Sequence, residues 1–558
     1  MNKASLNYIL EFSVVEPGKR EEYLNKLLQR KNAGEQKNVK LLKIIYRYID
    51  TDKINYWDSD EVCKELNVKS GELDTLKSRL LADFRVFVFG WEEIEKDLKR
   101  DFKGSDLEFD FLKARKMNAI GMKKEMKTFH LNFLNQLEKD RKGIIESYNL
   151  NAAKLFLCEY ESNEIMVHYY YVQKNYPQFL SFYKKIEQMY KNGKKFNLTQ
   201  VEEAEMNVRL LLTRAYKHIF KLISDKNYIS ALNNLYAAYD IIKEADLEIY
   251  RYGIPLLIAL IEFRLSNNEK LRKLCFEISN RADKDGRKSE WAMAKSYLAL
   301  LEFNEDKSKR HETKEKIKEY YEICTEANPY GVYTFQMIKS YVHILSLSPE
   351  NNSEGEKLMK HALANAVLSY NKSFVFLTYY QIENEKYFNK ILQVETMNSA
   401  FPKFIQPEES LLDDFYKVLN NILLTMNENV SPNIISNIYI TFLYIFFLKE
   451  GDLDLKHVEF IKEKLQRLVK TRNIAVDFAL YDTVKMAFVL QEDFAIMRKS
   501  DFLKKHLFDI KKLCDRIIES KKDSLYSILP PYAVLYTLAK RINVNEVWDL
   551  LKKYNWKD

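Results

Sequence analysis

The stretch from Lys226 to Ala238, which reads Lys-Asn-Tyr-Ile-Ser-Ala-Leu-Asn-Asn-Leu-Tyr-Ala-Ala, contains the pattern that decides the fold. Within it, Tyr228, Ala231, Leu235 and Ala238 follow one another at intervals of three or four residues, which is the spacing of one helix face. Small residues at two of these positions allow a neighbouring helix to approach closely. The stretch therefore predicts one member of a closely packed pair of helices.

The composition of the 558-residue chain favours helices throughout. Only 13 Gly and 10 Pro are present, whereas hydrophobic residues make up 46% of the chain, with 37 Tyr and 33 Phe. Parallel α/β folds, phosphate-binding loops and β-hairpins all use Gly in their turns. We therefore predict an all-α protein and exclude a large nucleotide-binding α/β domain.

From Asn151 onward, short polar breaks separate apolar-periodic segments of about 14–20 residues. The breaks recur about every 30–45 residues, which indicates repeat units of two helices. The clearest breaks are residues 191–195, 266–269, 283–287, 348–352 and 449–452.

The stretch quoted first resembles the second helix of a tetratricopeptide repeat. That family places an aromatic residue first, Ala three residues later, a bulky residue four beyond, and a small residue three further on. Tyr321, Cys324 and Pro329 give a second, shorter match, whereas Ile219 stands where the family prefers Gly, Ala or Ser. The resemblance implies a helical-repeat, tetratricopeptide-like solenoid of antiparallel helix pairs over residues 151–558.

Residues 1–110 differ from the rest, and we predict that they form a small N-terminal helical domain. Segments 20–30 and 37–49 read as amphipathic helices. A short helix that ends at Leu66, with Ser59 or Asp60 as its N-cap, precedes a turn and a longer helix from about Glu72 to Phe87. This succession is a helix-turn-helix pattern.

In a DNA-binding helix-turn-helix, the second helix enters the major groove. Here it would present Lys69, Thr75, Lys77, Ser78 and Arg79. Glu72 and Asp74 would repel phosphates, although carboxylates in a first turn also stabilise a helix without any partner. The region therefore has two interpretations, a DNA-binding unit and a structural or protein-contacting domain.

A basic segment follows within the predicted helical connector, residues 111–150. Its cations are Lys113, Arg115, Lys116, Lys123, Lys124 and Lys127, against the single acid Glu125. Clustered cations could add phosphate affinity next to a helix-turn-helix, so residues 60–127 are the predicted nucleic-acid contact. The alternative is a solvated helix face.

Aromatic side chains are the candidate protein contacts of the helical array. Consecutive residues of a helix point about 100° apart, so the three tyrosines of the run 169–171 cannot all face one core. Tyrosine is enriched where proteins bind proteins. The candidate contacts are Tyr169, Tyr170, Tyr171, Tyr320 and Tyr380.

The sequence lacks recognisable catalytic and metal-binding motifs. None of its 8 His residues has a His or Cys three or four positions later, and no phosphate-binding, dinucleotide or nucleophile-elbow motif occurs. The five cysteines lie far apart, which predicts reduced thiols in a cytoplasmic protein. The apolar run Ile434–Leu448 is shorter than the about 20 residues that span a bilayer, which predicts a buried helix. We therefore expect no catalytic residue, metal, cofactor or membrane partner.

These observations favour a non-enzymatic protein–protein interaction scaffold whose helical array binds a peptide or protein. Lys and Arg number 88 against 80 Asp and Glu, a balance that does not resemble that of a nucleic-acid coat protein. One alternative is a transcriptional or signalling regulator that contacts DNA through the helix-turn-helix, an architecture similar to that of peptide-responsive regulators. It requires Lys69, Lys77 and Arg79 to form one exposed positive face. A second alternative is an enzyme whose site is assembled from scattered residues.

Overall fold

The computed structural model describes most of the chain between Lys3 and Trp548. The residues outside the description are 1–2, 30–35, 52–53, 55–56, 149–150, 174, 194, 221–224, 347–351, 369–374, 376–377, 380–381, 384–386, 388–389, 392–393, 396–402, 405–406, 426–431, 450–454, 473–477, 521–533, 535, 543–544, 546–547 and 549–558. The chain divides into two compact units, Met1–Thr378 and Tyr379–Asp558. In the described residues, the regular structure is helical apart from one short two-stranded ladder.

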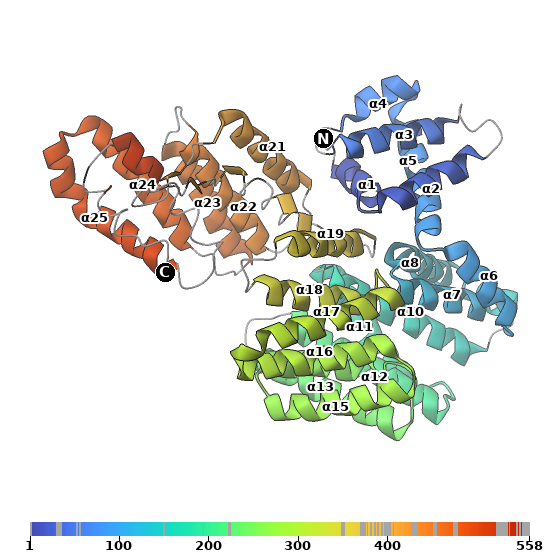
Figure 1. Ribbon diagram of the computed structural model, residues 1–558. Coiled ribbons are helices and arrows are strands. Elements are labelled where there is room, and N and C mark those ends of the chain that lie inside the picture. The colour runs from blue at the N-terminus through green and yellow to red at the C-terminus, as the bar shows by residue number, and fades with distance from the viewer. Residues whose placement is uncertain are drawn as a thin grey trace. The chain divides into compact units, whose positions relative to one another are not determined.

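Five helices open the first unit: α1 (Lys3–Ser13), α2 (Pro17–Leu28), α3 (Lys37–Asp50), α4 (Ser59–Leu66) and α5 (Ser70–Val88). Both α4 and α5 pack against α3, and α1 packs against α3 and α5 (Figure 1). The aromatic rings of Phe12 and Phe84 stack at 4.4 Å inside this group. Helices α4 and α5 confirm the predicted pair of helices, but the N-cap of α4 is Asp58, whose carboxylate accepts from the backbone N–H groups of Asp60 and Glu61.

Four helices lead into the array: α6 (Trp91–Asp101), α7 (Asp106–Ile120), α8 (Lys123–Lys139) and α9 (Arg141–Tyr148). Helix α7 packs on α8, and α8 packs on α10. Phe111, Met126 and Phe133 are buried in the same apolar core as the following helices. The segment predicted as a connector therefore contributes side chains to the core of the array, and the predicted boundaries at 110 and 150 stay a prediction.

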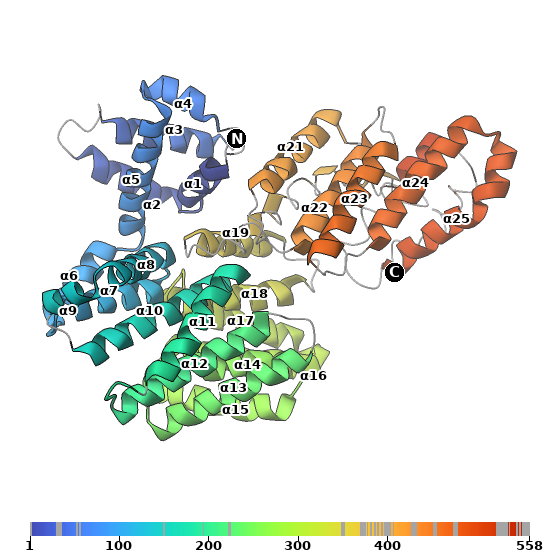
Figure 2. The ribbon, with the colours of Figure 1, turned by 180° about the vertical axis from the view of Figure 1, so that it is seen from behind.

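The array consists of paired neighbours in chain order: α10 (Ala152–Val172), α11 (Tyr176–Gly193), α12 (Gln200–Phe220), α13 (Asp225–Glu244), α14 (Gly253–Arg264), α15 (Asn268–Lys284), α16 (Lys288–Glu305), α17 (Arg310–Ala327), α18 (Val332–Ser346) and α19 (Asn352–Leu368). A short 3-10 helix, η3 (Lys307–Lys309), precedes α17. Each helix packs on its successor, as Figures 1 and 2 show.

We call α10, α12, α14, α16 and α18 the even-numbered row. Direct contacts join α10 to α12, α14 to α16, and α16 to α18, whereas α12 and α14 share no comparably extensive contact. In the part of the chain that the structure describes, no comparably extensive contact joins α11 to α13, α13 to α15, or α15 to α17. Contacts between alternate helices therefore favour the even-numbered row.

Three of the polar breaks read from the sequence coincide with helix ends: 191–195 with the end of α11, 266–269 with the start of α15, and 283–287 with its end. The breaks 348–352 and 449–452 lie mostly outside the described residues. The stretch that decides the fold lies in α13, where Ala231, Leu235 and Ala238 are fully buried. Helix α13 packs on α12 and α14. The small residues therefore occupy closely packed positions, as their spacing predicts.

The second unit contains α21 (Glu409–Thr425), α22 (Pro432–Leu448), α23 (Leu455–Arg472), α24 (Phe478–Ile496) and α25 (Lys499–Ser520), with strands β1 (Val394–Glu395) and β2 (Lys403–Phe404). The strands pair antiparallel, with Val394 opposite Phe404. Helix α22 is the predicted buried apolar helix and packs on α21, α23 and α24. Among the described helices, none combines the length and hydropathy that crossing a bilayer requires.

Candidate interaction surface

A run of four polar residues is buried in the middle of α10. Glu161, Ser162, Asn163 and Glu164 are each at most 7% exposed, because α8, α11 and α12 surround this helix. Buried polar groups need hydrogen-bond partners, and buried carboxylates need cations. The contacts of this run therefore explain why polar side chains occupy a core position.

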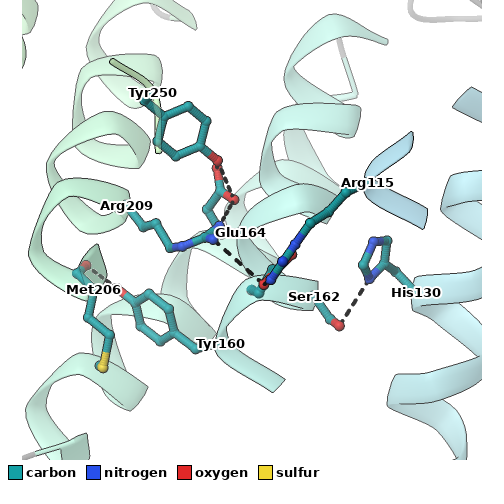
Figure 3. Close-up of polar contacts among 9 residues, drawn as sticks. Arg115, His130, Tyr160, Ser162, Glu164, Met206, Arg209 and Tyr250 are labelled. Atoms are coloured by element: carbon teal, nitrogen blue, oxygen red, sulfur yellow. Dashed lines mark hydrogen bonds and ion pairs between the residues drawn. The ribbon is translucent and has the colours of Figure 1, made fainter. Parts of the chain in front are cut away.

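Two arginines neutralise the two carboxylates (Figure 3). Arg115 of α7 forms a two-pronged ion pair with Glu161, with Nε–Oε1 and Nη2–Oε2 distances of 2.7 and 2.5 Å. Arg209 of α12 donates to Glu164 at 2.8 Å and lies 3.6 Å from Glu161. Burial acts to raise the pKa of Glu161, but the hydrogen bond from Arg115 and the charge of Arg209 outweigh it and hold that pKa below its usual value.

A tyrosine in an unusual backbone conformation completes this network. Tyr250, in the segment between α13 and α14, has a φ of +55°, in the left-handed region that bulky residues rarely occupy. Its hydroxyl donates to the Glu164 carboxylate, at 2.8 Å from each oxygen. Residues held in this region cost of order 1–3 kcal/mol, so surrounding contacts must fix them. The bond to Glu164 fixes Tyr250 and the segment that carries it.

The hydroxyl and imidazole groups nearby are also partnered within the core. Tyr160 donates to the carbonyl of Met206 at 3.0 Å, and the Ser162 hydroxyl lies 3.0 Å from His130 Nδ1 (Figure 3). Burial lowers the pKa of His130 to about 4, so this imidazole is neutral at pH 7. Since Ser162 and His130 are fully buried, a substrate cannot reach them, and we assign this network a structural role.

A group of aromatic and basic side chains from α10, α12, α13 and α14 lies close together in the array. We call His168, Tyr171, Tyr216, Phe220, Tyr228 and Arg264 the aromatic surface. The rings of His168 and Tyr216 stack at 5.3 Å, those of Tyr171 and Tyr216 at 4.5 Å, and those of Tyr171 and Phe220 meet edge to face at 5.8 Å. Arg264 of α14 donates to the Tyr228 hydroxyl at 3.0 Å. These contacts join side chains of α10, α12, α13 and α14.

Two side chains of the aromatic surface are surrounded by protein on most sides. His168 and Tyr171 keep partial solvent contact, yet burial lowers the pKa of His168 to about 3 and raises that of Tyr171 to about 12.

Lys123, the first residue of α8, brings a positive charge close to His168 of the aromatic surface. Its ammonium donates to the carbonyl of Asn118 at 3.0 Å and to the side-chain oxygen of the same residue, which caps the end of α7. Burial lowers the Lys123 pKa to about 8, and its charge adds to the lowering of the His168 pKa. No carboxylate pairs with Lys123 among the described residues.

The predicted DNA contacts on α5 do not form a single face. Lys69, Thr75, Ser78 and Arg79 are exposed, whereas Lys77 is only 8% exposed. The Lys77 ammonium lies 5.6 Å from the centroid of the Trp57 ring. The expectation that Lys69, Lys77 and Arg79 share one exposed face is corrected accordingly, because burial against aromatic rings removes Lys77 from the solvent.

The acids near α5 reduce its positive charge further. Asp74 lies 3.8 Å from Lys77, and Glu72 forms an ion pair of 2.5 Å with Lys37 of α3. The carboxylates in the first turn of α5 are thus partnered with lysines. Two cations of the predicted contact face remain exposed. Lys69 is the N-cap of α5, and Arg79 lies in the middle of this helix.

The basic segment 113–127 is divided among several environments. Lys113 pairs with Asp110 at 2.8 Å and lies 3.5 Å from Glu95. Arg115 is exposed and pairs with the buried Glu161, and Lys123 lies near His168. Lys116 is exposed, and Lys124 is half-buried. The structure therefore does not bring these cations together on one surface.

The predicted tyrosine contacts also separate into groups. Tyr169 and Tyr320 are buried, at 6% and 8% exposure, and Tyr320 packs edge to face on Trp291. Tyr170 and Tyr171 are half-buried, and Tyr171 belongs to the aromatic surface. Tyr380 lies outside the described residues.

Sequence reasoning missed His168, Tyr216, Arg264 and Tyr250. The polar run 161–164 inside an apolar helix was the available signal, because such a run requires charged partners from elsewhere in the chain. Within the described residues, no group of three or more His, Cys, Asp or Glu side chains is placed to hold a metal ion. Comparison with known proteins gives no match, either to a protein-family model or to a curated protein.

Proposed function

We propose that the first unit is a non-enzymatic interaction scaffold, a tetratricopeptide-like solenoid that binds a peptide or protein partner on its aromatic surface. The stacked aromatic rings of this surface, with the Lys123 ammonium near them and no carboxylate paired with it among the described residues, are the observation that carries this proposal. The succession of paired helices and the buried Ala231 and Ala238 support the repeat type.

The chemistry of the aromatic surface favours a ligand with an acidic group next to apolar side chains. Lys123 and Arg264 supply cations, which form strong hydrogen bonds with carboxylates. Tyr171 and Tyr228, which are half-buried, supply large rings with few rotatable bonds, so they lose little conformational entropy when they bind a partner. A peptide carboxylate, from an acidic side chain or a chain end, fits this combination.

The test is affinity capture from native lysate with the full chain, in the presence of nuclease. We expect a defined protein that wild type captures and that is lost with Lys123→Gln or with Tyr171→Ala. Lys270→Gln is the matched control, because Lys270 is an exposed lysine of α15, outside the even-numbered row. Equal capture by all variants would reject the aromatic surface as the binding site.

The alternative function is a regulator that contacts DNA through α5. The exposed side chains of Lys69, Thr75, Ser78 and Arg79 support it, and the burial of Lys77 weakens it. Salt-sensitive recovery of DNA without nuclease, lost in a Lys69→Ala/Arg79→Ala variant, would favour this alternative over the scaffold.

A further inference from the structure

Helix α25 in the second unit has one buried and one exposed face. Phe502, His506 and Ile510, spaced four residues apart, are buried. Phe502 packs edge to face on Phe494 of α24, with ring centroids 5.1 Å apart. The opposite face of α25 is therefore turned away from α24.

A single aromatic ring protrudes from that opposite face. Phe508 is 75% exposed, an unusual degree for a large apolar side chain. Residues three and four positions away are the neighbours of a side chain on a helix surface. For Phe508 all four of these positions are exposed lysines, namely Lys504, Lys505, Lys511 and Lys512. We call these five residues the Phe508 patch.

The nearest carboxylates are engaged at the edge of the patch. Asp493 of α24 forms an ion pair of 2.7 Å with Lys505 and lies 2.6 Å from His506 Nε2. The hydrogen bonds from Lys505 and His506 hold the pKa of Asp493 below its usual value. Asp509 lies 3.3 Å from His506 Nδ1. These acids therefore contact the side of α25 that faces α24, and the lysines around Phe508 give its solvent side a positive charge.

One aliphatic side chain extends the exposed apolar area. Leu507, adjacent to Phe508, is 36% exposed. An apolar centre with a charged rim is the usual anatomy of a protein–protein contact, in which an aromatic anchor contributes most of the affinity. A rim of one charge sign selects a partner of the opposite sign and speeds association.

A second exposed phenylalanine in the same unit shows what is distinctive about this patch. Phe460 of α23 is 52% exposed, but its neighbours three and four residues later are Glu463 and Lys464, of opposite charge. The Lys464 ammonium lies 4.9 Å from the Phe460 ring centroid and covers it. Phe460 is therefore a matched control: it is an exposed phenylalanine that four lysines do not surround.

We propose that the Phe508 patch docks an acidic amphipathic segment of a partner protein, with an apolar residue of that segment against Phe508. Nucleic acid would also be attracted by the lysines, and its bases could stack on Phe508. The protein partner is favoured because the exposed Leu507 beside Phe508 packs well on aliphatic side chains and has no flat ring for stacking. This docking site is separate from the aromatic surface and does not depend on the function proposed for it.

The test measures fluorescence anisotropy with the full chain and a labelled synthetic peptide that carries Glu on one helical face and Leu with Phe on the other. Three comparison probes separate the contributions: a Glu–Gly peptide of equal charge, the same amphipathic peptide with Lys in place of Glu, and a thymidine oligonucleotide. We expect the acidic amphipathic peptide to bind most tightly, and its affinity to fall as salt rises. Equal or tighter binding of the Glu–Gly peptide or the oligonucleotide would overturn the proposal.

Variants then assign the binding to the patch. Loss of an aromatic anchor costs about tenfold or more in affinity, so we expect that loss for Phe508→Ala and no change for Phe460→Ala. Lys504→Gln/Lys511→Gln should weaken binding and flatten its salt dependence. Both substitutions replace exposed side chains, and an unchanged thermal melt will show that the variants fold. Unchanged peptide affinity of Phe508→Ala would overturn the proposal.

Discussion

The guanidinium of Arg85 in α5 donates a hydrogen bond of 3.0 Å to the main-chain carbonyl of Leu368, the last residue of α19. The same side chain pairs with Glu11 of α1 at 2.9 Å and with Glu125 of α8 at 2.6 Å. Arg85 is fully buried. A carbonyl at the end of a helix has no partner within that helix, and Arg85 supplies one. One side chain thus joins the N-terminal helices, α8 and the end of the array.

Arg85→Met should strongly destabilise the first unit. It leaves the Glu11 carboxylate buried without its cation, and burial already raises the pKa of Glu11 despite the charge of Arg85. Breaking a buried ion pair from one side costs about 3–5 kcal/mol. Chemical denaturation monitored by circular dichroism measures the change in the free energy of unfolding. The double variant Arg85→Met/Glu11→Gln should recover part of the loss, and Arg100→Met, at an exposed arginine, should change little.

Ala231→Leu and Ala238→Leu should each destabilise the array by about 1–3 kcal/mol, because added methylene groups overpack a filled core. Both alanines are fully buried in α13. Ala237 in the same helix is exposed, so Ala237→Leu controls for the change in helix propensity. Equal melting temperatures for all three variants would show that the two positions have free space beside them.

Acid should destabilise the first unit through its buried histidines. The folded pKa of His168 is about 3, below the unfolded value of about 6.5, so the unfolded chain binds more protons between these pH values. Stability therefore falls as pH drops below 6.5. His168→Phe keeps an aromatic ring against Tyr216 but removes the titrating imidazole. Between pH 6.5 and 5, the free energy of unfolding of this variant should therefore fall by about 1–2 kcal/mol less than that of the wild type. Parallel pH dependence in denaturant titrations of both proteins would contradict this assignment.

Lys123→Met should stabilise the fold at pH 7 while weakening partner binding. The folded pKa of about 8 lies below the unfolded value of about 10.4, so burying the charged lysine disfavours folding at pH 7. Above the unfolded pKa the lysine is neutral in both states and the penalty disappears. We expect a gain of about 1 kcal/mol at pH 7, discounted for partial solvent contact, that shrinks between pH 8 and 10.4.

The control for this prediction is Lys270→Met, which removes an exposed lysine. A stabilised variant that has lost the captured partner would identify Lys123 as a residue kept for binding at the expense of stability. A destabilised Lys123→Met would show instead that the bonds to Asn118 outweigh the cost of burial.

The helices and their breaks were predictable from the sequence because they depend on local patterns. Polar breaks such as 266–269 end apolar periodicity directly, and the spacing of Ala231 and Ala238 predicted their burial. Helix α1 was not predicted, and α5 begins at Ser70, slightly before the predicted start at Glu72. These differences concern helix ends and a terminal segment, where the apolar pattern is shortest.

The candidate site was less predictable because it depends on contacts between distant residues. Lys77 looked exposed on a helical wheel, but Trp57 and Tyr8, from outside α5, bring their rings within 6.0 Å of its ammonium. Arg115 looked like a phosphate contact and pairs instead with Glu161. The charge of a side chain was readable from the sequence, while its partner was fixed only by the packing of helices.

The polar centre of α10 has a consequence for how the first unit folds. Solenoids commonly fold from any point along the array, because each repeat contacts only its neighbours. Here Glu161 and Glu164 obtain their cations from α7 and α12, and Glu164 its tyrosine from the segment before α14. A partly assembled array would contain these carboxylates without their partners. We therefore expect the helices on both sides of α10 to fold together in one cooperative step, with few half-folded arrays that expose apolar ends.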